Sequence, residues 1–443
     1  MSRIYVLTLG CDKNRVDGEV MIGSLRLAGY QVVDSPDIAS VIIVNTCGFI
    51  RDASRESIEM ILELAEYKKT HGCRALVVVG CMAERYKDEI IKDMPEIDVC
   101  VGVGQYEKIA EVVREFIEPT ILSGESFLNT PQNIRLAARA DTKMPHTAYV
   151  KIAEGCDTNC TYCTIPSIRG AYKSRPIEDI VSECRQLVDS GVKELILVAQ
   201  DTALYGQDIY GVMKLPELLT EISKTGVAWV RLMYVYPEHI KSTLIDALSS
   251  IDCVVKYIDM PLQHCEEKVL KKMGRGSGKY ELMSLIRVLR ERIEGLAIRT
   301  TLMVGFPGET EEDFDNLCDF VEEMRFERMG VFPFSQEEGT PASKMEHQVK
   351  ENKKKARYKK LMLLQQKIHF ASQKSFVGKS LRVIVDEFLA DEGTYIGRAY
   401  FDAPETDSVI FFTSEIPLAP GDFCDVLITK TNGYDLVGKG RHK

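Results

Sequence analysis

The first quarter of the chain alternates short apolar runs with segments of helical period. Strands that alternate with helices in this way are typical of a parallel sheet covered by helices. We therefore expect a parallel α/β domain over residues 1–118, followed by a linker rich in Pro, Asn, Thr and Ala over residues 119–145. The apolar runs are Ile4–Leu9, Val41–Asn45, Leu76–Val79 and Val99–Val101, and the helical segments include Ala53–Lys69 and Ala83–Asp93.

A longer alternation follows, in which six apolar runs each precede a segment of helical period. Six β/α units are too few for a closed eight-fold barrel, so we expect a partial (β/α)6 barrel over residues 146–346. Parallel sheets of this kind bind ligands beyond the carboxyl ends of their strands. The six runs are Ala148–Ala153, Leu195–Ala199, Ala228–Val235, Val254–Met260, Ala297–Val304 and Met329–Phe334.

The last hundred residues carry two further patterns. Residues 347–374 read as a basic connecting helix, in which the stretch 350–374 has nine Lys/Arg against one Glu. Leu361, Leu364, Ile368 and Ala371 share one face of it, and the basic face predicts either a solvated surface or a contact with nucleic acid. Short alternating strands with Gly turns then predict a small antiparallel β-barrel over residues 375–443.

Charge and hydropathy narrow the class of protein. The formal net charge is −10, so the chain as a whole is not drawn electrostatically to nucleic acid. We see no signal peptide and no apolar run near the ~18 to 20 residues of a membrane span, which predicts a cytoplasmic protein. In that compartment thiols stay reduced, so we expect seven of the thirteen cysteines to be small core residues: Cys73, Cys100, Cys184, Cys253, Cys265, Cys318 and Cys424.

Three cysteines, Cys156, Cys160 and Cys163, form a C-x₃-C-x₂-C motif directly after the first barrel strand. Structural zinc requires four ligands, and no second cysteine or histidine pair follows. An iron–sulfur cluster held by three thiolates would keep one iron open for a further ligand. The spacing therefore favours an iron–sulfur cluster, with zinc or a redox dithiol as alternatives.

This motif, placed after the first strand of a partial barrel, resembles the radical S-adenosylmethionine (SAM) superfamily. The resemblance implies that the open iron binds SAM, which the cluster cleaves to a 5′-deoxyadenosyl radical. It also implies SAM contacts by Gly305, Gly308 and Glu309, in a turn that by itself reads only as a capped helix start, and by Gln200 and Asp201, although the usual G-G-E sequence is absent. Gln263 and His264 end the fourth strand, where a histidine more often hydrogen-bonds its own loop than acts in catalysis.

A second trio, Cys11, Cys47 and Cys81, stands at the ends of three apolar runs in the first domain. Ends of parallel strands meet at one edge of a sheet, so these cysteines are either a cluster site or three buried thiols. Their G-C-x-x-N, N-T-C and G-C-x-A contexts, followed by the barrel motif and a TRAM-type β-barrel, resemble the radical SAM methylthiotransferases. The resemblance implies a second [4Fe–4S] cluster on this trio, which carries the sulfur to be donated, and SAM as both methyl donor and radical source.

Members of that family act either on an adenosine in transfer RNA or on an aspartate in a ribosomal protein of the small subunit. The charge of the C-terminal barrel helps to choose between these two substrates. Between residues 381 and 436 we count eleven acidic residues against three basic ones, a local net charge of −8. An RNA-binding barrel needs Lys and Arg for phosphates, so a basic partner fits better, unless the acids serve only solubility. The acidic residues are Asp386, Glu387, Asp391, Glu392, Asp402, Glu405, Asp407, Glu415, Asp422, Asp425 and Asp435, and the basic ones are Arg382, Arg398 and Lys430.

We therefore expect methylthiolation of the β-carbon of an aspartate in the decoding-centre ribosomal protein of the small subunit. An external electron donor and a sulfur donor are further expected partners, with a ribosomal RNA contact by the basic helix as a possibility. One alternative is methylthiolation of a tRNA adenosine. Another is a non-catalytic iron–sulfur or zinc protein that senses redox state or binds a partner.

Overall fold

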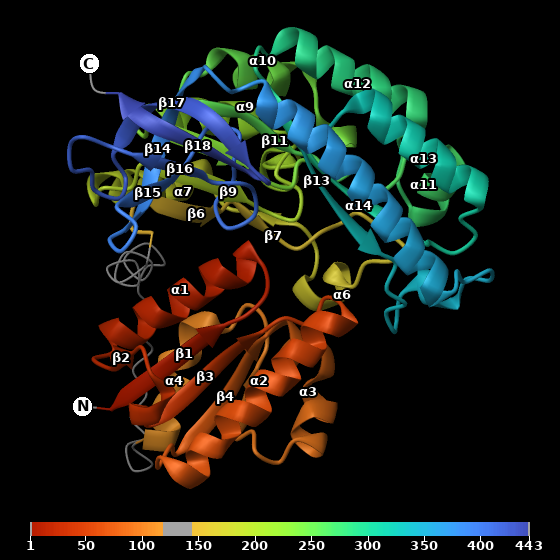
Figure 1. Cartoon of the computed structure of the whole chain (residues 1–443). Helices are drawn as coiled ribbons and strands as arrows, with labels where there is room; N and C mark the ends of the chain where they lie inside the picture. Colours follow the sequence, from red (N-terminus) through yellow and green to blue (C-terminus); the bar gives the residue numbers. More distant parts are fainter. Residues whose placement is uncertain (1, 118–143, 442–443) are drawn as a thin grey trace. The chain divides into compact units, whose positions relative to one another are not determined.

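The computed structural model describes residues 2–117 and 144–441, which divide into two compact units (Figure 1). Of the described residues, unit 1 comprises 2–117, 154–158 and 163–173, and unit 2 comprises 144–153, 159–162 and 174–441. All but the last two residues of the predicted linker, 119–145, lie outside the described residues. The predicted domain boundaries stay predictions.

Unit 1 is built on a five-stranded sheet of order β2-β1-β3-β4-β5, and every strand pair in it is parallel. Alternate residues of each strand face opposite sides, so Val41 and Ile43 pack under α1 and α4 while Ile42 and Val44 pack under α2 and α3. The bounds are β1 Arg3–Thr8, α1 Asp12–Leu27, β2 Gln31–Val33, β3 Val41–Thr46, α2 Arg51–Thr70, β4 Ala75–Gly80, α3 Cys81–Asp93, β5 Val99–Val101 and α4 Ile109–Ile117, with 3₁₀ turns at Pro36–Ile38 and Tyr106–Lys108.

The four strands predicted for this region are confirmed, and two elements go beyond the prediction. β2 has only three residues, too few to show a period. α1 buries polar side chains, among them Lys13, Asn14 and Asp17, in its first turns. A hydrophobic pattern cannot reveal a helix whose buried face is polar where it begins.

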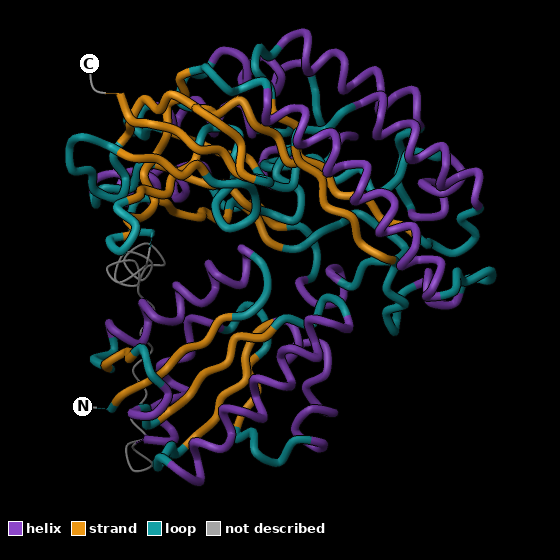
Figure 2. Tube along the Cα trace, in the orientation of Figure 1, coloured by secondary structure: helices purple, strands orange, loops and turns teal. Residues whose placement is uncertain are grey.

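Unit 2 contains a six-stranded parallel sheet whose order, β6-β9-β10-β11-β12-β13, follows the chain. Figure 2 draws the strands of this unit in orange and its helices in purple. The predicted partial barrel of six β/α units is therefore confirmed. The bounds are β6 Thr147–Lys151, α7 Ile177–Asp189, β9 Glu194–Val198, α8 Gln207–Tyr210, α9 Leu215–Ser223, β10 Trp229–Leu232, α10 Ser242–Ser250, β11 Val254–Asp259, α11 Glu267–Met273, α12 Lys279–Arg292, β12 Ala297–Val304, α13 Glu311–Met324, β13 Arg328–Pro333 and α14 Glu351–Lys374, with 3₁₀ turns at Pro237–His239 and Pro341–Lys344. The segment between β6 and α7 contains β7 Ala153–Glu154, α6 Ile165–Arg169 and β8 Lys173–Ser174, of which α6 lies in unit 1.

The C-terminal segment of unit 2 forms a closed barrel of order β14-β15-β16-β18-β17. The predicted small barrel is confirmed, and one of its pairs, β16 with β18, is parallel. An odd number of strands cannot alternate in direction all the way around a closed ring, so one parallel pair is required. The bounds are β14 Ser380–Leu389, β15 Thr394–Arg398, β16 Ile410–Thr413, β17 Phe423–Asn432 and β18 Asp435–Arg441.

The basic helix α14 buries a different face from the predicted one. Leu361 and Ile368 are buried as expected, but Leu364 is only partly buried and Ala371 is exposed. The buried face instead continues through polar positions, which are Lys354, Arg357, Gln365, His369 and Gln373. These polar side chains are buried because they have partners outside the helix: Arg357 pairs with Glu309 at 3.1 Å, and Gln365 donates to the backbone carbonyl of Phe326 at 2.8 Å.

Part of the acidity of the C-terminal barrel is internal. Asp386 pairs with Arg398 at 2.8 Å, and the same guanidinium reaches Glu194 of β9 at 2.8 Å. Asp402 pairs with Arg328 of β13, and Asp407 accepts a 2.7 Å hydrogen bond from the buried Tyr257 of β11. Asp402 and Asp407 therefore anchor the barrel to the six-stranded sheet, and Asp386 binds the arginine that pairs with Glu194, so none of these three carboxylates is available to an external partner.

The isolated cysteines behave largely as predicted. All thirteen are free thiols, and Cys73, Cys100, Cys184, Cys265, Cys318 and Cys424 are buried, while Cys253 is half-buried. Within residues 2–117 and 144–441, no helix is long and apolar enough to cross a membrane.

Candidate functional site

Unit 1 carries Cys11, Cys47 and Cys81 at the carboxyl edge of its sheet. Cys11 stands between β1 and α1, Cys47 directly follows β3, and Cys81 is the first residue of α3 after β4. β1, β3 and β4 are neighbours in the sheet and run parallel. Three cysteines distant in the sequence therefore share one edge, as the sequence predicted for them.

Glycines allow the three loops at this edge to approach closely. Gly10 has φ +90°, and a Cβ on it would stand 2.7 Å from the Cβ of Cys47 and 3.0 Å from its Sγ. A Cβ on Gly48 would stand 2.7 Å from the Cα of Met82, the residue after Cys81. Any side chain at either glycine would separate the loops, so the loop packing depends on its absence.

Asn14 is fully buried and ties the three loops together. Its Nδ2 donates to the carbonyl of Leu9 at 3.0 Å and to that of Thr46 at 2.8 Å. The Sγ of Cys81 lies 3.6 Å from its Oδ1, to which the thiol donates. The Asn of the G-C-x-x-N sequence thus fixes the loops after β1, β3 and β4 relative to one another.

Arg169 is a site residue that the sequence analysis missed. It belongs to α6, which lies in unit 1, and its side chain is only 1 % exposed. Its Nη2 donates to the Sγ of Cys81 at 3.3 Å and to Asn14 Oδ1 at 2.7 Å, and both terminal nitrogens donate to Asp17 at 3.2 Å. The polar face of α1 is thereby explained, because Asn14 and Asp17 are the partners of a buried guanidinium.

Burial governs the acidity of two thiols of unit 1, Cys47 and Cys81. Desolvation raises the pKa of Cys47 to about 11, against a backbone hydrogen bond at Phe49 that lowers it. Burial also raises the pKa of Cys81, and the charge of Arg169 opposes the shift. Free thiols at these positions are therefore protonated near neutral pH, and a metal that binds them must displace the protons.

The cysteines of the C-x₃-C-x₂-C motif have distinct surroundings in their own units. In unit 1, Cys156 is buried and the Sγ of Cys163 accepts from the backbone N–H of Ile165 at 3.4 Å. In unit 2, the Sγ of Cys160 lies 4.0 Å from both the hydroxyl of Tyr236 and an Nη of Arg275. Donors thus surround sulfur atoms that would carry negative charge as thiolates.

Two polar residues that follow strands of the six-stranded sheet are engaged by groups in the loops at its carboxyl end. Asp201 follows β9 and accepts from the backbone N–H of Ala203 at 3.0 Å, and its other oxygen binds His239. His264 follows β11, and its Nδ1 accepts from the N–H of Glu266 at 3.0 Å. Burial lowers the pKa of His264 to about 3, so the ring is neutral, as a loop hydrogen-bonder should be.

The predicted Gly305–Glu309 turn is shaped by its own glutamate. Glu309 is buried, its Oε2 accepts from the N–H groups of Gly305 and Phe306, and burial raises the pKa of its carboxyl to about 7. Both Gly305 and Gly308 have positive φ, and a Cβ on Gly305 would collide with Lys354. Direct contact of these residues with SAM stays a prediction, as it does for Gln200 and Asp201.

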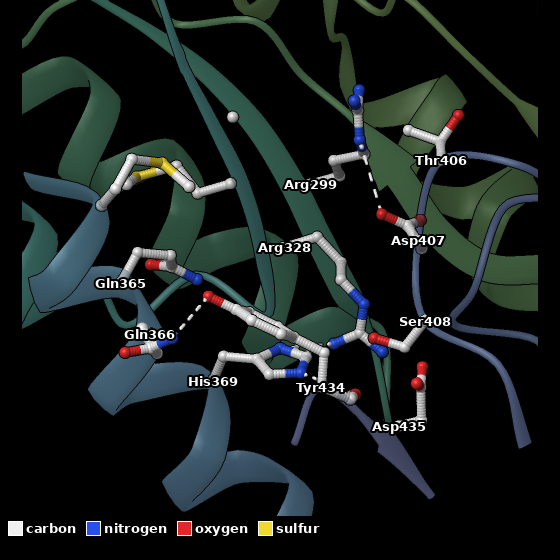
Figure 3. A pocket seen from close by; sticks show the side chains of 13 residues that line it. Arg299, Arg328, Gln365, Gln366, His369, Thr406, Asp407, Ser408, Tyr434 and Asp435 are labelled. Carbon is white, nitrogen blue, oxygen red and sulfur yellow. Dashed lines mark hydrogen bonds and ion pairs between the residues drawn. The ribbon is translucent and has the colours of Figure 1, made fainter. Parts of the chain in front are cut away.

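A cavity of about 270 Å³ lies elsewhere in unit 2 (Figure 3). Arg299, Arg328 and His369 line it together with Asp407 from the C-terminal barrel. Arg328 is the first residue of β13 and Arg299 the third of β12, so the cavity lies toward the amino ends of the strands. It is therefore at the other end of the sheet from the predicted SAM turn, which follows β12.

Family profiles match three parts of the chain. Residues 3–102 match the uncharacterized protein family UPF0004, residues 150–321 match the radical SAM superfamily, and residues 377–440 match the TRAM domain. The radical SAM and TRAM resemblances drawn from the motifs are confirmed by these matches.

Curated relatives match the chain over nearly its whole length. The ribosomal protein uS12 methylthiotransferase RimO of Lachnoclostridium phytofermentans is 46% identical over 98% of this chain and 99% of the relative. The protein of the same name from Clostridium kluyveri is 47% identical over 98% of this chain and 97% of the relative. Among solved structures, the radical SAM methyltransferase TsrM of Kitasatospora setae matches with a TM-score of 0.55 at 15% identity over 77% of each chain, which shows a shared fold.

Proposed function

This chain belongs to the family of radical SAM methylthiotransferases named ribosomal protein uS12 methylthiotransferase RimO, and we propose that it adds a methylthio group to the β-carbon of an aspartate in uS12. Two [4Fe–4S] clusters and SAM are the proposed cofactors. Cys156, Cys160 and Cys163 would hold the cluster that binds SAM. Cys11, Cys47 and Cys81 would hold the cluster that supplies sulfur.

One observation carries the second cluster: three cysteines share the carboxyl edge of the unit 1 sheet, beside a buried guanidinium. Among the described residues, no group of three or more His, Cys, Asp or Glu side chains is arranged to hold a single metal ion. A cluster differs, because each thiolate binds a separate iron and the sulfurs stand farther apart than the ligands of one ion. Two features support a cluster there: the three potential ligands are all thiols, and Gly10, which has no Cβ, allows its loop to lie close to Cys47.

The chemistry explains why both trios belong to one enzyme. Sulfur insertion at an unactivated C–H bond requires a radical source and a sulfur donor, which the bound clusters and SAM supply. The chain's own part is to hold them. Cys156 and Cys163 lie in the same compact unit as Cys11, Cys47 and Cys81, and Arg169, six residues after Cys163, bonds to Cys81.

Electrostatics support the protein substrate over tRNA. Eight of the eleven acidic residues counted in the C-terminal barrel remain after Asp386, Asp402 and Asp407 are set aside as internally paired. On the basic helix, Lys353 pairs with Glu311 at 3.0 Å and Lys360 with Asp315 at 2.8 Å. An acidic barrel and a partly neutralised basic helix favour a basic protein, such as a ribosomal protein, as the partner.

The test is a direct assay on both substrates. The anaerobically reconstituted enzyme, with SAM, sulfide and a reductant, is incubated separately with purified uS12 and with unmodified tRNA. We expect the mass of one methylthio group on the aspartate-containing peptide of uS12 and none on the tRNA nucleosides. Modification of tRNA alone would replace the proposed substrate, and formation of 5′-deoxyadenosine with neither product would leave the substrate assignment wrong. Action on a ribosomal protein would also locate the enzyme in the cytoplasm.

A further inference from the structure

Arg169 is a buried cation that touches a sulfur atom of the Cys11, Cys47 and Cys81 trio. Its side chain is 1 % exposed, and its Nη2 lies 3.3 Å from the Sγ of Cys81. A guanidinium is always charged and cannot lose its proton at physiological pH. Arg169 therefore places a permanent positive charge and a hydrogen-bond donor at the Sγ of Cys81.

The position of Arg169 is fixed by partners on three sides. Asp17 of α1 accepts from both terminal nitrogens at 3.2 Å, Glu154 accepts from Nη1 at 2.9 Å, and Asn14 accepts from Nη2 at 2.7 Å. These bonds hold the planar fork, so the guanidinium does not have to reorganise to meet the sulfur. Arg169, these three partners and Cys81 all belong to unit 1.

A purely structural salt bridge does not require the sulfur contact. Asp17 and Glu154 already supply two carboxylates to Arg169, and neither of them needs Cys81 nearby. The geometry nevertheless directs Nη2 to Asn14, Asp17 and Cys81 together. A donor at a ligand sulfur stabilises the more negative, reduced state of a cluster, because hydrogen bonds to sulfur and local charge set its potential.

We propose that Arg169 is a positioning residue that raises the reduction potential of the cluster held by Cys11, Cys47 and Cys81, through its contact with Cys81. The inference rests on the proposed function, because it requires a cluster at this trio. Cys163 and Arg169 lie in one segment of unit 1, so the loop that carries a ligand of one proposed cluster also tunes the other.

The experiment isolates one cluster and measures its potential. In the full chain, Cys156→Ala, Cys160→Ala and Cys163→Ala together remove the barrel trio, and the protein is reconstituted with iron and sulfide. Iron content and potentiometric titration followed by electron paramagnetic resonance are then compared with and without Arg169→Gln. We expect Arg169→Gln to lower the ratio of reduced to oxidised cluster at a fixed potential about tenfold, or about 59 mV for one electron.

Further variants separate tuning from misfolding. Arg169→Gln leaves Asp17 as an uncompensated buried charge, so Arg169→Gln with Asp17→Asn is the version expected to fold, as circular dichroism would show. Arg169→Lys keeps the positive charge, so the reduction potential of its cluster should lie closer to that of the parent protein than to that of Arg169→Gln. Arg15→Gln is the matched control, because Arg15 is on the same helix as Asn14 but pairs with Glu19 at 3.7 Å and is 29% exposed.

The outcomes distinguish the two proposals. The inference is supported if the reduction potential falls in Arg169→Gln, or in the double variant Arg169→Gln with Asp17→Asn, and does not fall in Arg15→Gln. A bound cluster whose potential is the same in all variants overturns the inference and leaves the proposed function intact. Absence of any cluster from the parent triple-cysteine variant overturns both, because no cluster then exists at Cys11, Cys47 and Cys81.

Discussion

The carboxyl edges of the two parallel sheets are built in opposite ways. In unit 1, three adjacent strands each end at a cysteine, and the loops are joined by Asn14 and spaced by glycine. In the six-stranded sheet of unit 2, the strand-end groups are not cysteines: His264 bonds to the backbone of its own loop, and Asp201 bonds to its own loop and to His239 after β10. The C-x₃-C-x₂-C cysteines come from one loop after the first strand of that sheet, with Cys160 in unit 2 and Cys156 and Cys163 in unit 1.

This difference separates two ways to make a site from parallel strands. A trio assembled from three strands depends on the register of the whole sheet, so it is sensitive to any change in loop packing. A trio within one loop is set by local spacing and leaves the other strand ends free to shape a pocket. Substitutions should therefore affect the two edges differently, and the following experiments test that expectation.

The largest effect is expected from the loop trio. Cys160→Ala should abolish formation of 5′-deoxyadenosine, because the cluster that reduces SAM would lose a ligand and its open iron site. Iron content should fall from about eight to about four per chain. Chromatographic detection of 5′-deoxyadenosine and iron analysis measure the two quantities, and retained SAM cleavage would remove Cys160 from the proposed site.

Cys81→Ala should give a split result. Methylthiolation of uS12 should be lost and iron should again fall to about four per chain, but 5′-deoxyadenosine should still form. Comparing product by mass spectrometry with 5′-deoxyadenosine in one reaction shows the split. Loss of both activities at full iron content would contradict separate roles for the two edges.

Loop packing at the unit 1 edge should respond to a single methyl group. Gly10→Ala introduces a Cβ 2.7 Å from that of Cys47 at a φ of +90°, and we expect a loss of about 3 kcal/mol in the free energy of unfolding. Gly29→Ala is the matched control, because Gly29 has φ +88° with no atom within 4 Å, and it should lose only about 1 kcal/mol. Urea unfolding measures both, and equal losses would show that the approach to Cys47 is not tight.

The smallest effect concerns His264 at the unit 2 edge. Its folded pKa of about 3 lies below the ordinary 6.5, so below pH 6.5 the unfolded chain binds a proton that the folded chain does not. Its stabilising contribution is therefore present above pH 6.5 and lost as the pH falls. His264→Asn keeps an acceptor for the N–H of Glu266. Between pH 7.5 and 5.5, the free energy of unfolding of this variant should fall by about 1.4 kcal/mol less than that of the parent protein. Urea unfolding at pH 7.5 and 5.5 gives this difference, and an unchanged pH dependence would mean that His264 is protonated when folded.

Sequence patterns predicted the sheets because their strands are continuous apolar runs. Val41–Thr46 and Ala75–Gly80 are buried at every position, and such runs between helices specify parallel strands. The strand ends then located Cys11, Cys47 and Cys81 at one edge without any local motif. β18 shows only a weak strand pattern, because its apolar residues Leu436 and Val437 are followed at once by Gly438 and Lys439.

The partners of these groups could not be predicted, because they depend on contacts distant in sequence. Arg169 stands 88 residues from Cys81, and nothing in the S-I-R-G sequence distinguishes it from a surface arginine. The acidity of the C-terminal barrel was likewise counted as surface charge, although Asp386 and Asp402 face Arg398 and Arg328. A sum of charges carries no information on which of them are neutralised by burial.

The buried arginines between the six-stranded sheet and the C-terminal barrel limit how this chain can be re-engineered. Arg231 and Arg398 are 0 % and 2 % exposed at their side chains and meet at Glu194, and Arg231 also donates to the carbonyl of Tyr400. A chimera with a barrel from an unrelated protein would leave Glu194 and Arg231 without these counterparts. An exchange of the barrel between proteins therefore requires that the buried charges Glu194, Arg231 and Arg398 be transferred or replaced together with it.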